Sequence, residues 1–167
     1  YLKRRGEHLK ENLIAGYVLT CLGVGNHLNY KCSRRKDSRA DRIAQRILSK
    51  NGSNTIIDFD PSRGSDERQY CSPGFNLPVG TLMRERYLEY PEYHTSLDNK
   101  DLITMEALQG SVNACLDIVQ EFEQMPVWKN SIMMGEPQLG KRDLYPEFSL
   151  KTYSKDDFRN MLWILNF

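Results

Sequence analysis

The sequence predicts an α/β fold with a mainly parallel sheet, and three observations carry this prediction. Two apolar runs, at residues 13–22 and 77–83, have the composition and length of buried strands. Between them, residues 29–59 follow the order strand, amphipathic helix, strand, which is typical of a βαβ unit. A second amphipathic helix is predicted at residues 104–122, and 167 residues are the length of one domain with a short appendage.

The composition is ordinary for a soluble globular protein, with 40% hydrophobic and 27% charged residues. The net charge of +1 gives no field that would favour a nucleic acid or a membrane surface as a partner. No apolar run approaches the roughly 20 residues that span a bilayer. The four cysteines include no C-x-x-C pair, and four free thiols suit a reducing compartment, so we expect a cytoplasmic protein.

The first elements are a polar helix and a strand. Residues 3–12 are charged and predict a short exposed helix. Leu13 to Leu22 are almost continuously apolar, which predicts a central strand covered on both faces. The chain offers two strong amphipathic helices to cover its strands, so we expect a large apolar patch to remain exposed on one side of the sheet.

A short strand is expected at residues 29–33, followed by a helix that Asp37 or Ser38 caps. The helix has apolar residues at i, i+3, i+4, i+7 and i+8, namely Ala40, Ile43, Ala44, Ile47 and Leu48. Residues 55–59 then form the next strand. Arg34 precedes the helix in a basic turn. It is either a solvated surface residue or a bidentate holder of a substrate carboxylate.

Residues 64–99 surround the strand at 77–83 with polar loops, where reacting groups are usually held. Asp66 and Glu67 begin a short helix over residues 66–70. Their negative charges either stabilise the positive N-terminal end of the helix dipole, or they face a metal or substrate site. Downstream, Tyr87, Tyr90 and Tyr93 could wall a pocket.

The helix capped by Thr104 carries an apolar stripe that we expect to pack on the sheet as core: Leu108, Val112, Cys115, Leu116, Val119 and Phe122. Residues 129–150 are rich in glycine and proline and predict an extended surface segment. A last helix follows, so the predicted division is a domain at residues 1–150 and a helix at 151–167 that begins an appendage.

Three motifs resemble the catalytic domain of zinc aminopeptidases. They are Ser65-Asp66-Glu67, then Gly74-Phe75-Asn76-Leu77-Pro78, and then Tyr93-His94-Thr95-Ser96-Leu97-Asp98. The residues of these motifs are similar to those of the bacterial aminopeptidase-like branch associated with polysaccharide biosynthesis. The same is true of the segment Gly135-Glu136-Pro137-Gln138-Leu139-Gly140-Lys141-Arg142. The resemblance covers roughly residues 1–146. It implies a three-layer α-β-α fold with a mixed, mainly parallel sheet, zinc exopeptidase-like and incomplete in this segment, with a winged helix following it.

The resemblance also implies a function and a set of site residues. The function is a zinc-dependent aminopeptidase-like hydrolase that attacks a peptide or amide bond with a zinc-bound water. The implied roles are Glu67 as catalytic residue, His94 as metal ligand, and Asp66, Arg68, Tyr93 and Asp98 as substrate-binding or supporting residues. Asp98 would orient His94, or else would only cap the next turn. The expected cofactor is one zinc ion, because the position that carries a metal-binding aspartate in the family is Thr20 here, a poor zinc ligand.

A zinc site needs three protein ligands, and this chain convincingly offers one, so the segment alone is expected to be inactive. The other ligands would lie in a missing N-terminal half or a partner chain, and the chain begins with Tyr1-Leu2 rather than Met. Two alternatives stay open: a non-catalytic binding module that keeps the fold, and an assembly role. The expected partner is a peptide-like or amide substrate, with no nucleic acid and no membrane.

Overall fold

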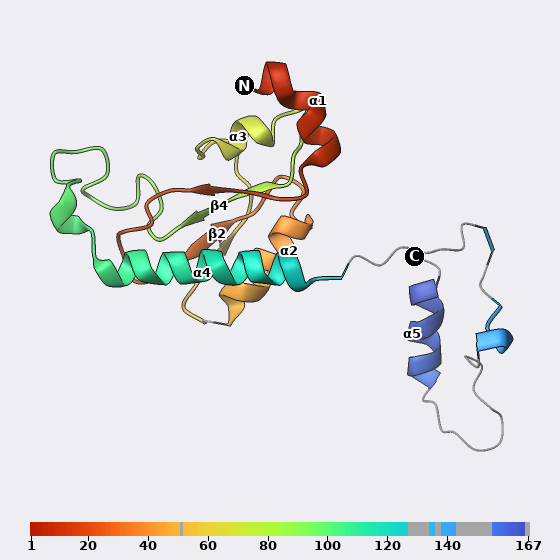
Figure 1. Cartoon of the computed structure of the whole chain (residues 1–167). Helices are drawn as coiled ribbons and strands as arrows, with labels where there is room; N and C mark the ends of the chain where they lie inside the picture. The colour runs from red at the N-terminus through yellow and green to blue at the C-terminus, as the bar shows by residue number, and fades with distance from the viewer. Residues whose placement is uncertain (51, 127–133, 136–137, 143–154, 166–167) are drawn as a thin grey trace. The chain divides into compact units, whose positions relative to one another are not determined.

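The computed structural model describes residues 1–50, 52–126, 134–135, 138–142 and 155–165. The chain divides into two units, Tyr1–Met125 and Pro126–Phe167 (Figure 1). The first unit contains the sheet and four of the helices described below. None of the described helices is long and apolar enough to cross a membrane.

The first unit is built on a four-stranded mixed sheet in the order β1-β4-β2-β3. Strands β1 (Gly16–Leu19) and β4 (Val79–Met83) are parallel, as are β2 (Asn29–Lys31) and β3 (Ile56–Ile57). The two pairs meet through antiparallel pairing of β2 with β4. The predicted α/β class and the parallel strand–helix–strand unit at residues 29–57 are therefore confirmed.

Strand β1 corrects one prediction, because it lies at an edge of the described sheet and not at its centre. Only Gly16–Leu19 of the long apolar run forms a strand, and Leu19 is 54% exposed. The interior strands are β4 and β2, and all five residues of β4 are buried. A continuous apolar run shows that a segment needs cover, but its place in the sheet depends on strand pairing.

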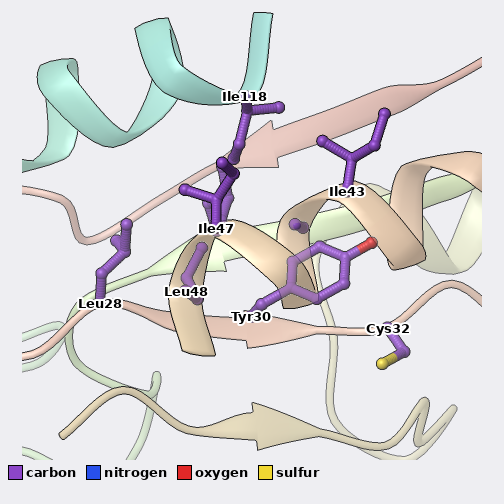
Figure 2. Packing of buried hydrophobic residues seen from close by; sticks show 9 residues of the cluster. Leu28, Tyr30, Cys32, Ile43, Ile47, Leu48 and Ile118 are labelled. Atoms are coloured by element: carbon purple, nitrogen blue, oxygen red, sulfur yellow. The ribbon is translucent and has the colours of Figure 1, made fainter. Parts of the chain in front are cut away.

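One face of the sheet carries the larger hydrophobic core (Figure 2). Tyr30 and Leu82 project from β2 and β4 toward helix α2 (Arg39–Ser49), which buries the apolar stripe that the sequence predicted. Ser38 caps this helix, and its side chain forms a capping box with Asp41. Ile118 of helix α4 (Met105–Gln124) completes the cluster.

The other face carries a smaller core around Cys71, Leu77 and Val79. Helix α1 (Leu2–Asn12) packs Leu2 and Leu9 on it, and the short helix α3 (Glu67–Tyr70) contacts β4. In Figure 1, α1 and α3 lie on the opposite side of the sheet from α2 and α4. The predicted exposed helix at residues 3–12 and the short helix at 66–70 are confirmed within one or two residues.

Helix α4 is confirmed as an element, with Thr104 as its cap, but its predicted packing is confirmed only for Cys115 and Phe122, which contact the larger core. Its buried residues are Ala107, Ser111 and Ile118. Four members of the predicted core stripe are exposed instead: Leu108, Val112, Leu116 and Val119. Small side chains at 107 and 111 let the helix approach the first unit's core closely, and Ser111 Oγ lies 2.9 Å from the carbonyl oxygen of Leu22.

In the second unit the structure describes a 3-10 turn at Gly140–Arg142 and helix α5 (Lys155–Leu165). The helix predicted at the end of the chain is therefore present. The boundary predicted after residue 150 and most of the loop predicted at 129–150 lie outside the described residues.

Candidate functional site

A pocket of about 200 Å³ lies over the sheet face that carries Lys31 and Met83. Its walls come from two loops, one that follows β3 and one that follows β4. Charged and aromatic side chains dominate the lining, among them Lys31, Asp60, Arg63, Arg86, Tyr87 and Glu89. Several charged side chains converge beside apolar surface in this pocket, which is the composition expected of a site for a small polar ligand.

A buried ion pair joins β2 to the loop beside this pocket. Lys31 Nζ lies 3.0 Å from Glu67 Oε1, and their side chains are 4% and 0% exposed. The same ammonium donates to the carbonyl oxygens of Asp60, at 2.9 Å, and Arg63. The other Glu67 oxygen accepts from the Ser65 N–H at 2.9 Å. All three Lys31 donors and both Glu67 oxygens are thus engaged, and the loop is fixed against the sheet.

The pocket rim carries a second, exposed charge cluster. Glu89 Oε1 lies 3.1 Å from Arg63 Nη1 and 3.6 Å from Arg86 Nη1, so the carboxylate forms an ion pair with each guanidinium group. All three side chains are about 40 to 60% exposed, so solvent screens these pairs and they contribute little to stability. Because they are exposed, the two guanidinium groups can exchange Glu89 for an anionic group of a ligand at low energetic cost.

The loop after β4 carries the tyrosines that the sequence marked as possible pocket walls. Tyr87 lines the pocket, and burial together with the nearby Glu67 carboxylate raises the pKa of its phenol. Its hydroxyl is buried without a hydrogen-bond partner among the described residues. Tyr90 and Tyr93 instead pack edge to face on each other at 5.4 Å, and the Tyr90 hydroxyl contacts Cys21 Sγ at 3.6 Å.

His94 follows directly, and its ring is exposed and stacked on Tyr93 at a centroid distance of 4.0 Å. Its backbone has a φ of 58°, in the left-handed region that non-glycine residues enter rarely and mostly where the fold imposes it. Asp98 is exposed, and its N–H donates to the Thr95 carbonyl at 3.2 Å, closing a turn.

The predicted site residues are not among those that line this pocket: Glu67, His94, Asp66, Arg68, Tyr93 and Asp98. Asp66 is exposed at the start of α3 and lines a groove beside α1 with Leu9 and Tyr70. Arg68 is exposed in a different pocket, which it shares with Arg34 and Phe59. Asp66 and Arg68 therefore face different surfaces, while Glu67 between them points inward to Lys31.

A zinc site needs at least three protein ligands, and the described residues can be judged by that requirement. Among them, no group of three His, Cys, Asp or Glu side chains is placed to hold a metal ion. The described part of this chain therefore does not form a complete zinc site by itself.

Sequence reasoning missed two buried charged residues of the first unit that hold several hydrogen bonds each, Lys31 and Asp41. Asp41 is fully buried and accepts from the Tyr30 hydroxyl at 2.8 Å, the Ser33 N–H at 2.7 Å and the Ser38 N–H at 2.9 Å. Burial alone would raise the pKa of this carboxyl, but the hydrogen bonds outweigh it and lower the pKa. The Ser38-x-x-Asp41 spacing was the available signal, because it is a variant of the capping box with aspartate at the third helical position.

Comparison with known proteins adds the family. Residues 1–125 match a family model described as a domain of unknown function, DUF4910. The chain belongs to the DUF4910 family. The remaining residues of this DUF4910 chain, 126–167, match a model described as a winged helix-turn-helix, and the two matches meet where the chain divides into its two units.

A relative from Clostridium acetobutylicum is described as a candidate polysaccharide biosynthesis protein with an aminopeptidase-like domain. It is 39% identical over 168 residues, which cover 99% of the DUF4910 chain and 38% of the relative. The chain thus spans well under half the length of this relative. The expected resemblance to the aminopeptidase-like branch linked to polysaccharide biosynthesis is confirmed at this level.

Two crystal structures are similar in fold. A candidate peptidase from Clostridium acetobutylicum has a TM-score of 0.70 and 37% identity, covering 99% of this chain and 36% of that one. The LapA protein of Legionella pneumophila has a TM-score of 0.50 and 15% identity, covering 74% of this chain and 39% of that one. The first supports a peptidase-like fold for the first unit, and the second shows a similarity of fold alone.

Proposed function

We propose that this chain is the C-terminal part of a zinc-dependent, aminopeptidase-like hydrolase that acts on a peptide or amide bond. The observation that carries the proposal is the likeness along almost the whole chain to a relative described as having an aminopeptidase-like domain. The three-layer zinc-exopeptidase architecture belongs to this proposal too, and the placement of helices on both faces of a mixed sheet supports it.

In this proposal the chain supplies one metal ligand and a set of shaped loops. His94 is the ligand, because it is an exposed imidazole held by an unusual backbone conformation and by the Tyr93 ring. The remaining ligands must come from polypeptide outside the described residues, because those residues contain no group of three candidate ligands. Arg63, Arg86 and Tyr87 would then hold the substrate in the pocket beside the Lys31–Glu67 pair.

The predicted catalytic role of Glu67 stays a prediction. Both of its oxygens are occupied, by Lys31 and by the Ser65 N–H, so action as a base would require the ion pair to open. The same contacts support a positioning role in which Glu67 anchors the loop at residues 60–67. Asp66, Arg68 and Asp98 are exposed and free to approach a substrate or a partner segment.

The second candidate is a binding or assembly module that keeps the aminopeptidase-like fold without its chemistry. Thr20 favours it, because threonine stands at the end of β1 where the resembled family has a metal-binding aspartate. The winged helix-turn-helix match favours it as well. Residues 126–167 carry six basic and five acidic side chains, so this segment has no large excess of positive charge that would favour nucleic acid as its partner.

Zinc content and hydrolysis separate the two candidates. The test uses a protein that carries the complete aminopeptidase-like domain together with this chain. His94→Ala should remove most of the bound zinc measured by atomic absorption and abolish release of 4-nitroaniline from aminoacyl-4-nitroanilides. His27→Ala is the matched control, because His27 is also an exposed loop histidine. Unchanged zinc stoichiometry in His94→Ala would refute the ligand role, and a metal-free, inactive wild type would favour the binding module.

A further inference from the structure

A second pocket, of about 500 Å³, shares no lining residue with the pocket beside Lys31. Three segments that are far apart in the sequence meet in it. Arg34 comes from the turn between β2 and α2, and Arg68 comes from α3. Phe59 and Pro61 come from the segment after β3. We call it the Arg34–Arg68 pocket, and it places Arg34 where it could hold an anionic group.

The lining of the Arg34–Arg68 pocket contains two arginines and no aspartate or glutamate among the described residues. The directions of the neighbouring acidic side chains explain this. Asp58 and Asp60, which flank Phe59, line the pocket beside Lys31 instead. Asp66, two residues before Arg68, lines the groove beside α1. The positive charge of the pocket is therefore not neutralised by its own walls.

Both guanidinium groups keep donors for a ligand. Within the part of the chain that the structure describes, neither arginine forms an ion pair, whereas Arg63 and Arg86 both contact Glu89. Arg34 Nη1 donates to the carbonyl oxygen of Cys71 at 3.5 Å, a long hydrogen bond that uses only one of its donors. A guanidinium binds a carboxylate or a phosphate through parallel N–H groups, and the remaining donors can supply them.

The stem of Arg68 is held in place by a glycine. A Cβ added at Gly64 would lie 2.6 Å from both Cγ and Cδ of Arg68, so the aliphatic part of the arginine lies directly on Gly64. This contact limits the rotamers of Arg68 in the free protein. Less side-chain entropy is then lost when the guanidinium contacts a ligand.

The remaining walls are apolar and chemically inert. Phe59 packs partly buried against the smaller core, and Pro61 and Pro73 line the pocket with it. Cys71 also belongs to the lining, but it is fully buried and its thiol contacts the carbonyl oxygen of Val79 at 3.2 Å. Burial raises the pKa of this thiol, which disfavours the reactive thiolate. The pocket is therefore suited to binding and not to covalent chemistry.

We propose that the Arg34–Arg68 pocket binds a small organic anion. The phosphate or carboxylate group of the ligand contacts the two guanidinium groups, and its apolar body lies against Phe59. The volume of about 500 Å³ falls within the range of roughly 300–1,000 Å³ that is typical of small-molecule pockets. This inference does not depend on zinc or on hydrolysis, so its failure and that of the proposed function are distinguishable.

The experiment is isothermal titration calorimetry with phenyl phosphate, benzoate, phenol and inorganic phosphate as probes. The protein again carries the complete aminopeptidase-like domain together with this chain. Phenyl phosphate or benzoate should bind saturably, and phenol at least about tenfold more weakly, because it lacks the anionic group. Tighter binding of phenyl phosphate assigns a phosphate ligand, and tighter binding of benzoate assigns a carboxylate. Inorganic phosphate that binds as tightly as phenyl phosphate would contradict the contact with Phe59.

Arg34→Gln and Arg68→Gln should each weaken binding of the tighter probe at least about tenfold, or about 1.4 kcal/mol, because each removes a charge-assisted contact. Both side chains are exposed, so circular dichroism should show unchanged helix content. Arg35→Gln is the matched control, because it removes the same charge from an exposed neighbour that does not line the pocket. It should stay within about twofold of wild type, since solvent screens its charge.

His94→Ala should also keep the wild-type affinity, because His94 does not line the pocket. Loss of binding in this variant would assign the anion to the proposed zinc site and overturn the inference. Absence of saturable binding to both anionic aromatic probes would overturn it as well, as would wild-type affinity in either arginine variant.

Discussion

The buried pair between Lys31 and Glu67 yields the most specific test of this structure. Glu67→Gln keeps the shape of the side chain and an oxygen to accept from Ser65, but it removes the negative charge. Lys31 then stays buried at 4% side-chain exposure with two carbonyl oxygens and a neutral amide. Lys31→Met makes the opposite change and leaves the fully buried carboxylate with only the Ser65 N–H.

Each single change should cost about 3–5 kcal/mol of unfolding free energy, the usual effect of leaving one buried charge without its partner. That is a large part of the roughly 5–15 kcal/mol that stabilises a typical domain. The double variant removes both charges together, so its cost should fall short of the sum of the singles by about 2–3 kcal/mol.

Urea unfolding followed by circular dichroism measures these differences at pH 7. The matched control is Lys36→Met, because Lys36 forms an ion pair with Asp58 of the same 3.0 Å length, but with side chains 55% and 77% exposed. It should change stability by less than about 1 kcal/mol. If Glu67→Gln costs no more than this control, or if the singles are additive in the double variant, the pair does not stabilise the loop and the reasoning is wrong.

Three further predictions concern other buried or exposed groups. Asp41→Asn should cost about 3 kcal/mol at pH 7, because it loses hydrogen bonds to a charged acceptor. The pKa of Asp41 is lowered in the folded state. The ionised carboxylate therefore stabilises the fold above the unfolded-state pKa of about 3.9, and this stabilisation is lost as the pH falls through the folded-state pKa. The difference in urea midpoint between Asp41→Asn and wild type should accordingly narrow below about pH 4. Thr81→Val should leave stability unchanged or raise it by up to about 1–2 kcal/mol, because the buried Thr81 hydroxyl has no hydrogen-bond partner among the described residues; a clear loss in thermal unfolding would contradict this. In the complete protein, His94→Ala should bind less than about half the zinc of His27→Ala by atomic absorption, as expected for the loss of one of few ligands.

Much of the fold was predictable because local patterns specify elements. The 3.6-residue periodicity and the Ser38 cap placed α2 to within a residue, and Thr104 placed the start of α4. The position of β1 in the sheet was not predictable. An apolar run indicates that the strand must be buried, but it does not indicate which strands pair with it. The packed face of α4 was predicted only in part, at Cys115 and Phe122, for a related reason. The helix is apolar on more than one side, and its contact with the core selected Ala107, Ser111 and Ile118.

The candidate site was likewise predictable in part from the sequence. Sequence motifs drew attention to residues 64–99, and the pocket loops do come from this segment and from the residues just before it. The inward orientation of Glu67, however, depends on Lys31, which lies 36 residues away on another strand. A pairing across that distance leaves no local pattern in one sequence.

By itself the sequence determined the α/β class, most helices and strands, and the resemblance to the aminopeptidase-like branch, because periodicity, capping and short motifs are properties of neighbouring residues. Only the tertiary structure decided that β1 is an edge, that Lys31 and Asp41 are buried with their partners, and that the leucines and valines of α4 face outward. These properties arise from contacts between segments far apart in the chain, where the free energy of burial and pairing depends on which surfaces meet.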